Sequence, residues 1–275
     1  MSFVIHQVRA SYAFVERNFY LIKRYWTWEI VFLLYSIAHS LSVSFIGLGM
    51  EKLNPNADID VERMVLYLVV GTLVWRYLSM IFYWITDLIS IERWEGTIEY
   101  TLMAPISRLT HMAGQTVFAV LYSIFFSGII LCVTILMFEL DMSRANFLGA
   151  AVVMLAGSFS FVGIGIMGAV LPMLFPERGS QMTHIIVATL LLVSGVYYPI
   201  EVLPSYLQAL GTLSPATYVL QGAREALMEG APLASLWQYI WPLLISGVIA
   251  IPAGLWVFDQ AEKYAKRAGK LARGG

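Results

Sequence analysis

Long runs of apolar residues constrain this chain more than any other feature of its sequence. A helix needs about 20 apolar residues to cross the hydrocarbon of a bilayer, and six stretches reach or approach that length. Only 13% of the 275 residues are charged, whereas soluble domains average roughly 25%. We therefore predict an all-α integral membrane protein with six transmembrane helices. The predicted spans are Trp26–Met50, Met64–Thr86, Met112–Phe138, Phe147–Leu174, Met182–Tyr198 and Trp237–Phe258.

Several other functions are disfavoured by composition. The net charge is −1, and no basic run precedes the C-terminal tail, so we expect no nucleic-acid partner. The single cysteine, Cys132, excludes an intrachain disulfide. We expect no signal peptide, because the first apolar run begins at Trp26 and is too long for the apolar region of a signal sequence.

The distribution of lysine and arginine predicts the orientation, since cytoplasmic loops carry an excess of both. Twelve of these residues lie before the first span, after the last span or in the loops of one side, and four lie in the loops of the other side. We therefore place both termini in the cytoplasm. The twelve are Arg9, Arg17, Lys23, Arg24, Arg93, Arg108, Arg178, Lys263, Lys266, Arg267, Lys270 and Arg273, and the four are Lys52, Arg63, Arg144 and Arg224.

The chain divides into three parts. Residues 1–25 are expected to form an amphipathic helix on the inner membrane surface, because apolar side chains recur at helical spacing and charged ones project elsewhere. A soluble helix packed on a partner would show the same stripe. Residues 26–258 form the predicted six-span domain, and residues 259–275 form a basic cytoplasmic tail. The stripe consists of Val4, Val8, Tyr12, Val15, Phe19 and Ile22.

A polar segment of 17 residues, 92–108, separates the second and third spans on the predicted cytoplasmic side. Its glutamates recur at spacings of three and four, so a helix would carry them on one face. Gly96 would interrupt that helix or admit another backbone, and Pro105 would end it. The segment fits either a docking element for another protein or a helix in the lipid headgroups. The glutamates are Glu92, Glu95 and Glu99, and Leu102, Met103 and Ala104 precede the proline.

The predicted outer segment 199–230 combines prolines with many apolar residues. Ser214 followed by Pro215 is typical of a helix N-cap and first turn. Irregular backbone cannot face lipid, so we expect two short helices that dip into the outer leaflet and return as a re-entrant hairpin. Two further prolines, Pro199 and Pro204, punctuate its first half.

Two polar residues are predicted near the middle of the membrane. Arg76 lies twelve residues into the second span and His39 thirteen residues into the first, so antiparallel helices bring both close to the midplane. An arginine at this depth costs roughly 2.5–3.5 kcal/mol on insertion scales and usually faces protein or water. Arg76 therefore lines a pathway, together with His39, or else it donates to carbonyls and hydroxyls of a neighbouring span.

Catalytic motifs are absent from the sequence. There is no GxxxxGK[ST] phosphate loop, no HExxH zinc site and no GxSxG nucleophile elbow, and the four histidines are dispersed. We therefore expect no catalytic residue, no metal site and no cofactor bound by this chain.

Two stretches resemble parts of the permease subunits of ATP-binding-cassette (ABC) type-2 exporters. ERWEGTIEYTLMAPISR, residues 92–108, resembles their cytoplasmic stretch after the second span. SGVYYPIEVLPSYLQALGTLSPATYVLQGAREALMEG, residues 194–230, resembles their fifth span and outer hairpin. The six-span layout with both ends inside matches as well, so the resemblance covers nearly the whole chain.

The resemblance implies roles for individual residues. Residues 92–108 would form a coupling helix that seats in a groove of an ATPase subunit, and the prolines at 199, 204 and 215 would be the joints of the outer hairpin, with Arg224 and Gly230 at its far end. No motif of the family transfers a role to Arg76. The implied coupling residues are Glu92, Glu95, Gly96, Thr97, Glu99, Leu102, Met103 and Pro105.

The resemblance also implies a larger machine in a prokaryotic inner membrane. Two permeases, identical or related, would work with two copies of a cytosolic ATPase subunit that binds ATP and Mg²⁺. The substrate would be amphipathic, such as a drug, a lipid or a lipid-linked glycan, and would leave the cytoplasm or the inner leaflet. The competing hypothesis is a membrane scaffold or membrane-embedded enzyme without transport, and co-purification of an ATPase would discriminate between the two.

Overall fold

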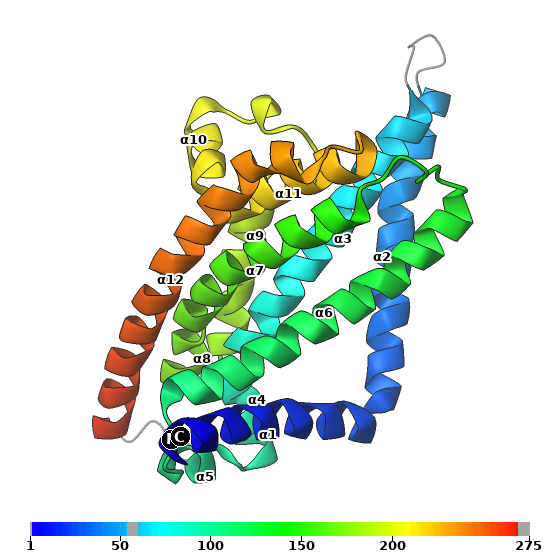
Figure 1. Ribbon diagram of the computed structural model, residues 1–275. Helices are drawn as coiled ribbons and strands as arrows, with labels where there is room; N and C mark the ends of the chain where they lie inside the picture. Colours follow the sequence, from blue (N-terminus) through cyan, green and yellow to red (C-terminus); the bar gives the residue numbers. More distant parts are fainter. Residues whose placement is uncertain (1, 54–59, 269–275) are drawn as a thin grey trace.

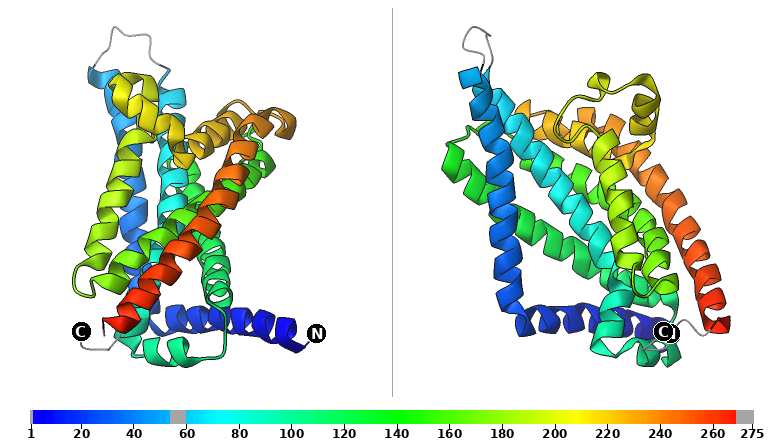
Figure 2. Two further views of the ribbon diagram at one scale, coloured as in Figure 1. Left: turned by 90° about the vertical axis from the view of Figure 1, so that its left-hand side faces the viewer. Right: turned by 180° about the vertical axis from the view of Figure 1, so that it is seen from behind.

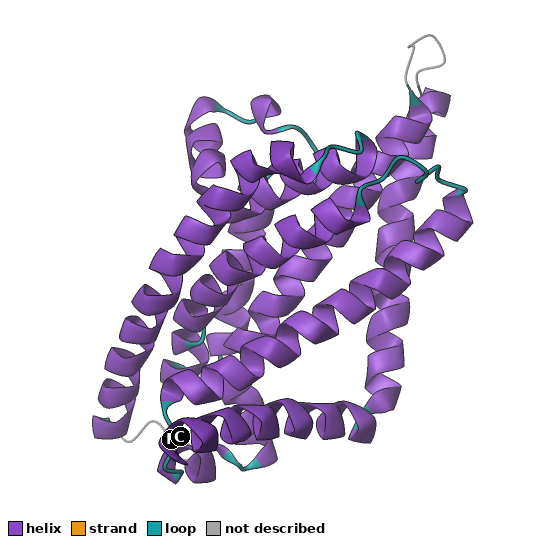
Figure 3. Cartoon of the chain, viewed as in Figure 1, coloured by secondary structure: helices purple, strands orange, loops and turns teal. Residues whose placement is uncertain are grey.

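The computed structural model describes residues 2–53 and 60–268, except for the side chains of residues 2–4, 51–53 and 102. This described part is helical throughout, with loops but no strands (Figure 3). Within these described residues, five helices are long and apolar enough to cross a membrane. They are α2 (Trp26–Leu53), α3 (Val61–Thr86), α6 (Arg108–Phe138), α7 (Phe147–Gly168) continued by α8 (Val170–Leu174), and α12 (Leu233–Arg267).

The fifth predicted span corresponds to α9 (Gly179–Val193), an apolar helix of 15 residues. The predicted end at Tyr198 is wrong, because Ser194 is the C-cap of α9 and Gly195 adopts a φ of 70°. Glycine enters this left-handed region without the steric penalty of a Cβ atom. The chain therefore turns away from the helix axis at Gly195.

The short helices gather at the two ends of the bundle. Figure 1 shows α1 lying across one end, beside α4 and α5, whereas η1, α10 and α11 lie at the opposite end. Two further views show the same separation (Figure 2). The bounds are α1 (Ser2–Arg24), α4 (Leu88–Glu95), α5 (Ile98–Met103), η1 (Ile200–Val202), α10 (Ser205–Leu213) and α11 (Pro215–Met228).

Helix α3 forms the centre of the bundle. Of its most apolar stretch, 83% is buried, compared with 22% in α2 and in α12. Its side chains Tyr77, Leu78 and Phe82 are completely buried between α2, α6, α7 and α11. The outer faces of α2 and α6 carry exposed apolar residues such as Leu34 and Phe125. Contact of such an apolar surface with the hydrocarbon of a bilayer is favourable, whereas its contact with water is unfavourable.

Glycines allow α7 and α12 to pack closely. A Cβ atom on Gly163 would lie 2.5 Å from the backbone carbon of Ala250, and one on Gly254 would lie 2.8 Å from the carbonyl oxygen of Gly163. Small residues permit such close approach of helices in membranes. The Ser160 hydroxyl adds a hydrogen bond to the carbonyl oxygen of Leu243 at 2.9 Å. This helix pair is therefore held by backbone proximity as well as by side chains.

Candidate functional site

The polar segment between the second and third spans folds into two short helices. Helix α4 ends at Glu95, where Gly96 adopts a φ of 73° and donates its N–H to the carbonyl of Arg93 at 3.1 Å. Helix α5 follows and ends at Met103, two residues before Pro105. The predicted interruption at Gly96 is confirmed. The predicted single face of three glutamates is wrong, since the break separates Glu99 from the other two.

Glu92 lies inside the protein. Its side chain is 1% exposed, and its Oε1 atom accepts a hydrogen bond from Arg17 Nη1 at 3.0 Å and lies 3.0 Å from His111 Nε2. In the single chain the Glu92 side chain therefore offers no exposed atoms to a docking partner, and its predicted coupling role could act only through the residues that it holds in place. Arg17 precedes Glu92 by 75 residues and His111 follows it by 19, so glutamate spacing alone could not reveal these partners.

The Arg17–Glu92–His111 cluster joins α1, α4 and α6. Burial raises the pKa of Glu92, but the hydrogen bonds and charges of His111 and Arg17 outweigh it and hold the pKa below its ordinary value. An unpaired charge at this depth would be strongly destabilising, whereas paired and hydrogen-bonded charges are tolerated. The cluster therefore keeps Glu92 ionised and fixes α4 against its two neighbours.

Two more charged residues anchor α4. The Glu95 carboxylate accepts a hydrogen bond from the Tyr25 hydroxyl at 3.1 Å, at the junction of α1 and α2. The Arg93 guanidinium donates to the carbonyl oxygens of Pro172 and Met173 at 2.9 and 3.1 Å, at the end of α8. Glu95 is thus largely covered, and α4 is tied to both sides of the bundle.

Arg108 anchors the chain where the segment enters α6. Its guanidinium contacts both carboxylate oxygens of Glu262 in α12, at 2.8 and 2.9 Å. Such bidentate pairing restricts the orientation of both side chains. The partner lies 154 residues further along the chain, and sequence reasoning missed it. The end of α12 is therefore tied to the start of α6.

The opposite side of α4 and α5 is exposed and rich in aromatic residues. Met103, Tyr100 and Trp94 are 75%, 74% and 68% exposed. Sequence reasoning missed Tyr100 and Trp94, although aromatic residues are enriched at protein interfaces. Thr97 is half-buried as the N-cap of α5, and the side chain of Leu102 lies outside the described residues. The set termed here the α4–α5 surface consists of Trp94, Glu99, Tyr100, Met103 and Pro105.

At the other end of the bundle, prolines begin each short helix of the outer segment. Pro199 and Pro204 occupy the N-cap positions of η1 and α10, and Pro215 is the first residue of α11. Ser214 takes the N-cap position of α11, but its hydroxyl forms a hydrogen bond with the Ser194 hydroxyl at 2.8 Å instead of capping the helix. The predicted N-cap position of Ser214 and the first-turn proline are both confirmed, although the Ser214 side chain makes no hydrogen bond to the backbone of α11.

Arg224 holds α11 against the beginning of the outer segment. Its guanidinium donates to the carbonyl oxygens of Gly195 and Val196 at 2.9 and 2.7 Å and lies 3.5 Å from the centre of the Tyr67 ring. A Cβ atom on Gly71 would lie 2.2 Å from the Val196 carbonyl oxygen. Glycine at position 71 therefore makes room for this contact. The two ends of the outer segment are fastened together on α3.

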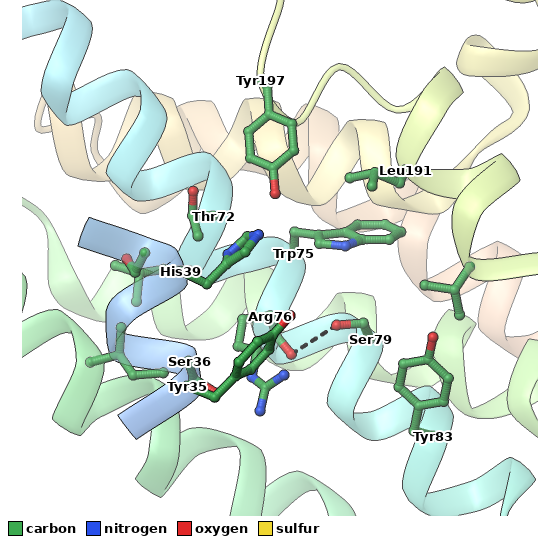
Figure 4. A pocket seen from close by; sticks show the side chains of 14 residues that line it. Tyr35, Ser36, His39, Thr72, Trp75, Arg76, Ser79, Tyr83, Leu191 and Tyr197 are labelled. Carbon is green, nitrogen blue, oxygen red and sulfur yellow. Dashed lines mark hydrogen bonds between the residues drawn. The ribbon is translucent and has the colours of Figure 1, made fainter. Parts of the chain in front are cut away.

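Arg76 and His39 line one cavity of about 220 Å³ between α2, α3 and α9. Figure 4 shows that hydroxyl groups surround it, including those of Tyr35, Thr72 and Tyr197. Among the described residues no acceptor receives a hydrogen bond from the Arg76 guanidinium, and its Nε atom is buried without a partner. The geometry thus supports a cavity-lining Arg76, because the alternative of donation to a neighbouring span finds no acceptor there.

The comparisons with known proteins agree with this arrangement. The family described as ABC-2 type transporter matches residues 10–228, which is most of the chain. This chain belongs to the ABC-2 type transporter family. It is thus a multi-pass membrane permease, and the resemblance noted from its two sequence stretches is confirmed.

Two curated relatives of this ABC-2 permease are themselves named as permeases. The probable multidrug ABC transporter permease YbhR of Escherichia coli is 24% identical over 193 residues, which cover 70% of this chain and 50% of the relative. The linearmycin resistance permease protein LnrN of Bacillus subtilis is 30% identical over 166 residues, which cover 59% of this chain and 42% of the relative. The matched part therefore spans about half the length of each relative.

Proposed function

We propose that this ABC-2 permease is the transmembrane subunit of an ATP-driven exporter and that a separate cytosolic ATPase subunit docks on the α4–α5 surface. The observation that carries this proposal is the two-sided character of α4 and α5. One side exposes Trp94, Tyr100 and Met103, and the other is fixed to the bundle through Glu92 and Arg93. An exposed aromatic patch on helices that are fixed to the bundle is suited to bind a partner and to transmit its movement.

The contacts that hold α4 and the start of α6 determine which helices would be displaced by a partner that pushes on the α4–α5 surface. The Arg17–Glu92–His111 cluster connects it to α1 and α6, and Arg93 connects it to α8. Arg108 connects the same region to α12. Closure of two ATPase subunits on bound ATP would therefore displace several helix ends together. The ATPase partner would supply the energy, and this chain would supply the transmembrane helices that move.

The proposed topology has six crossings and both termini in the cytoplasm. Helix α9 would complete the fifth crossing, with η1, α10 and α11 as a re-entrant hairpin in the outer leaflet. The position of α1 beside α4 and α5 supports a common cytoplasmic side (Figure 1). Helix α1 would lie at the inner membrane surface, since Val8, Tyr12 and Phe19 remain more than half exposed. In this orientation the last turns of α12, which ends at Arg267, would extend into the cytoplasm.

The cavity that Arg76 and His39 line would form part of the export pathway. It lies against α2, whose outer face is largely exposed in a single chain. A second permease, identical or related, would cover that face and complete the pathway. The printed names of the relatives and the mixed polar and apolar lining support an amphipathic substrate, taken from the cytoplasm or the inner leaflet of a prokaryotic plasma membrane.

Co-purification tests the proposed docking. The chain would be expressed with the ATPase subunit encoded beside it, and ATPase recovery and substrate export would be measured for Glu99→Lys and Met103→Asp. Both changes oppose docking, by charge reversal or by burial of a carboxylate, and both side chains lie outside the bilayer core. We expect normal membrane insertion, at least a tenfold loss of bound ATPase and loss of export.

Glu177→Lys is the matched control, because it reverses an exposed charge in the loop between α8 and α9 on the same side. It should retain ATPase binding. Native ATPase recovery and export by Met103→Asp would refute docking on this surface. Mg²⁺-dependent ATP hydrolysis by the pure chain would contradict the proposal that ATP is hydrolysed by a partner subunit.

A further inference from the structure

A second cavity lies below Arg76, along the inner half of α3. It measures about 270 Å³ and is bounded by α2, α3, α4 and α6. Arg76 and Tyr83 line both this cavity and the one above it, so the two adjoin along one face of α3. The lower one, termed here the inner cavity, has two carboxylates in its wall, Glu29 and Asp87.

Neither carboxylate has a cationic partner within hydrogen-bonding distance among the described residues. Glu29, in the first turn of α2, accepts a hydrogen bond from the Tyr122 hydroxyl. Asp87 follows the last residue of α3, and its Oδ1 atom is buried without a hydrogen-bond partner. Burial raises the pKa of Asp87, against the opposing effects of the Ser180 hydroxyl and His184. A bound cation would relieve this cost of burying negative charge.

Aromatic rings form much of the remaining wall of the inner cavity. Tyr83, Trp84 and Tyr122 line the inner cavity, and the rings of Trp84 and Tyr122 meet edge to face with centres 5.2 Å apart. The electron-rich faces of such rings attract cations, by about 0.5–2 kcal/mol depending on desolvation. The same rings provide apolar contact area. The wall is therefore suited to a molecule that carries positive charge on an apolar body.

Positive charge in the wall is confined to the far end of the inner cavity. Arg76 precedes Asp87 by eleven residues on α3, which corresponds to roughly 16 Å along the helix axis. Asp87 therefore lies at the α4 end of α3, whereas the Arg76 backbone lies deeper along the same helix. A cation that enters from the inner side meets negative charge first.

We propose that the inner cavity binds the positively charged group of an amphipathic organic cation, with Glu29 and Asp87 as counter-charges and the aromatic rings as the apolar wall. This inference rests on the proposed export function and names the class of its substrate. The Arg76 guanidinium repels the charged group and orients the molecule, so its cationic end stays near Asp87 and its apolar part faces Tyr83 and Trp84.

Direct binding to the purified full chain tests this inference without ATP or a partner. The probes are the ethyl ester of rhodamine B, a permanent organic cation, and rhodamine B itself, which carries a carboxylate. Fluorescence anisotropy should show tighter binding of the ester. Glu29→Gln and Asp87→Asn, which preserve shape, should each weaken binding of the ester about tenfold. Arg76→Gln should strengthen it severalfold, and Glu177→Gln should leave it unchanged.

Each contrary result overturns the inference. Absence of binding by the native chain, or unchanged affinity in both carboxylate variants, excludes a cation site. Weaker binding in Arg76→Gln assigns the cavity to an anionic or zwitterionic molecule instead. Melting temperatures near that of the native chain show that the variants are folded. Since the assay contains no ATPase, failed docking on the α4–α5 surface would refute the export proposal while leaving this binding result intact.

Discussion

Removing the carboxylate of Glu92 should destabilise the permease, because it leaves the Arg17–Glu92–His111 cluster without its negative charge. The side chains of Glu92 and His111 are 1% and 3% exposed, and removal of one partner from a buried pair costs about 3–5 kcal/mol. Arg17 is 27% exposed, so water can solvate its guanidinium when the carboxylate is removed. We therefore expect a destabilisation of about 3 kcal/mol, the lower end of this range. By the scaling of soluble domains, this lowers the melting temperature by roughly 6–12 °C.

Thermal unfolding of Glu92→Gln in one detergent, followed by intrinsic tryptophan fluorescence, measures this effect. Glu99→Gln is the matched control, since Glu99 is exposed on α5 and substitutions of that kind change stability by about 0.5 kcal/mol or less. The double variant Arg17→Gln with Glu92→Gln should lose less than the sum of the single variants, because contacting residues are energetically coupled. A Glu92→Gln melting temperature within 1 °C of the control would refute the stabilising role of the cluster.

The pH dependence of the same difference follows from the lowered pKa of Glu92. In the unfolded chain this carboxyl titrates near 4.3, above its pKa in the folded protein. Its stabilisation is therefore fully present above that value and is lost as pH falls through the lower, folded pKa. The difference in melting temperature between the native chain and Glu92→Gln should therefore shrink as the pH falls below about 4.

Two more predictions concern orientation and packing. In a Cys132→Ser background, Ser205→Cys should react with a membrane-impermeant thiol reagent from outside intact cells and Glu99→Cys only after lysis, and reversed labelling would refute the orientation. Gly163→Val should lower the melting temperature because its side chain would meet the α12 backbone, at a cost of about 1–3 kcal/mol. Gly49→Val, where no atom lies within 4 Å of the added Cβ, should change stability much less.

Features that depend on local sequence were predictable. Long apolar runs have the length of a membrane crossing, so five helices could be assigned from their residues alone. Glycine and proline act on their own backbone, which explains why the break at Gly96 and the helix start at Pro215 were predicted correctly. The end of α9 was missed because apolar composition continues to Tyr198, whereas the backbone already turns at Gly195.

Features that depend on distant partners were not predictable in the same way. The regular spacing of Glu92, Glu95 and Glu99 indicated one exposed acidic face. Only the fold brings Arg17 and His111 to Glu92 and buries it, and only the fold turns Trp94 and Tyr100 outward. Arg76 and His39 line one cavity, and their similar depth was predictable from their positions in two spans. The inner cavity, whose wall contains Glu29 and Asp87, was not predictable, because it forms only where α2 packs against α3 and α6.

The basic residues of the predicted cytoplasmic side have a second role that a count of charges does not show. Arg17, Arg93 and Arg108 contributed to the predicted orientation, and each also holds α4 or the start of α6 against another helix. Orientation depends on the number of such charges, whereas anchoring depends on each individual contact. Replacement of one of them by lysine would keep the charge and the topology but lose the planar, forked geometry of the guanidinium. The proposed transmission from the α4–α5 surface should therefore be more sensitive to such substitutions than membrane insertion is.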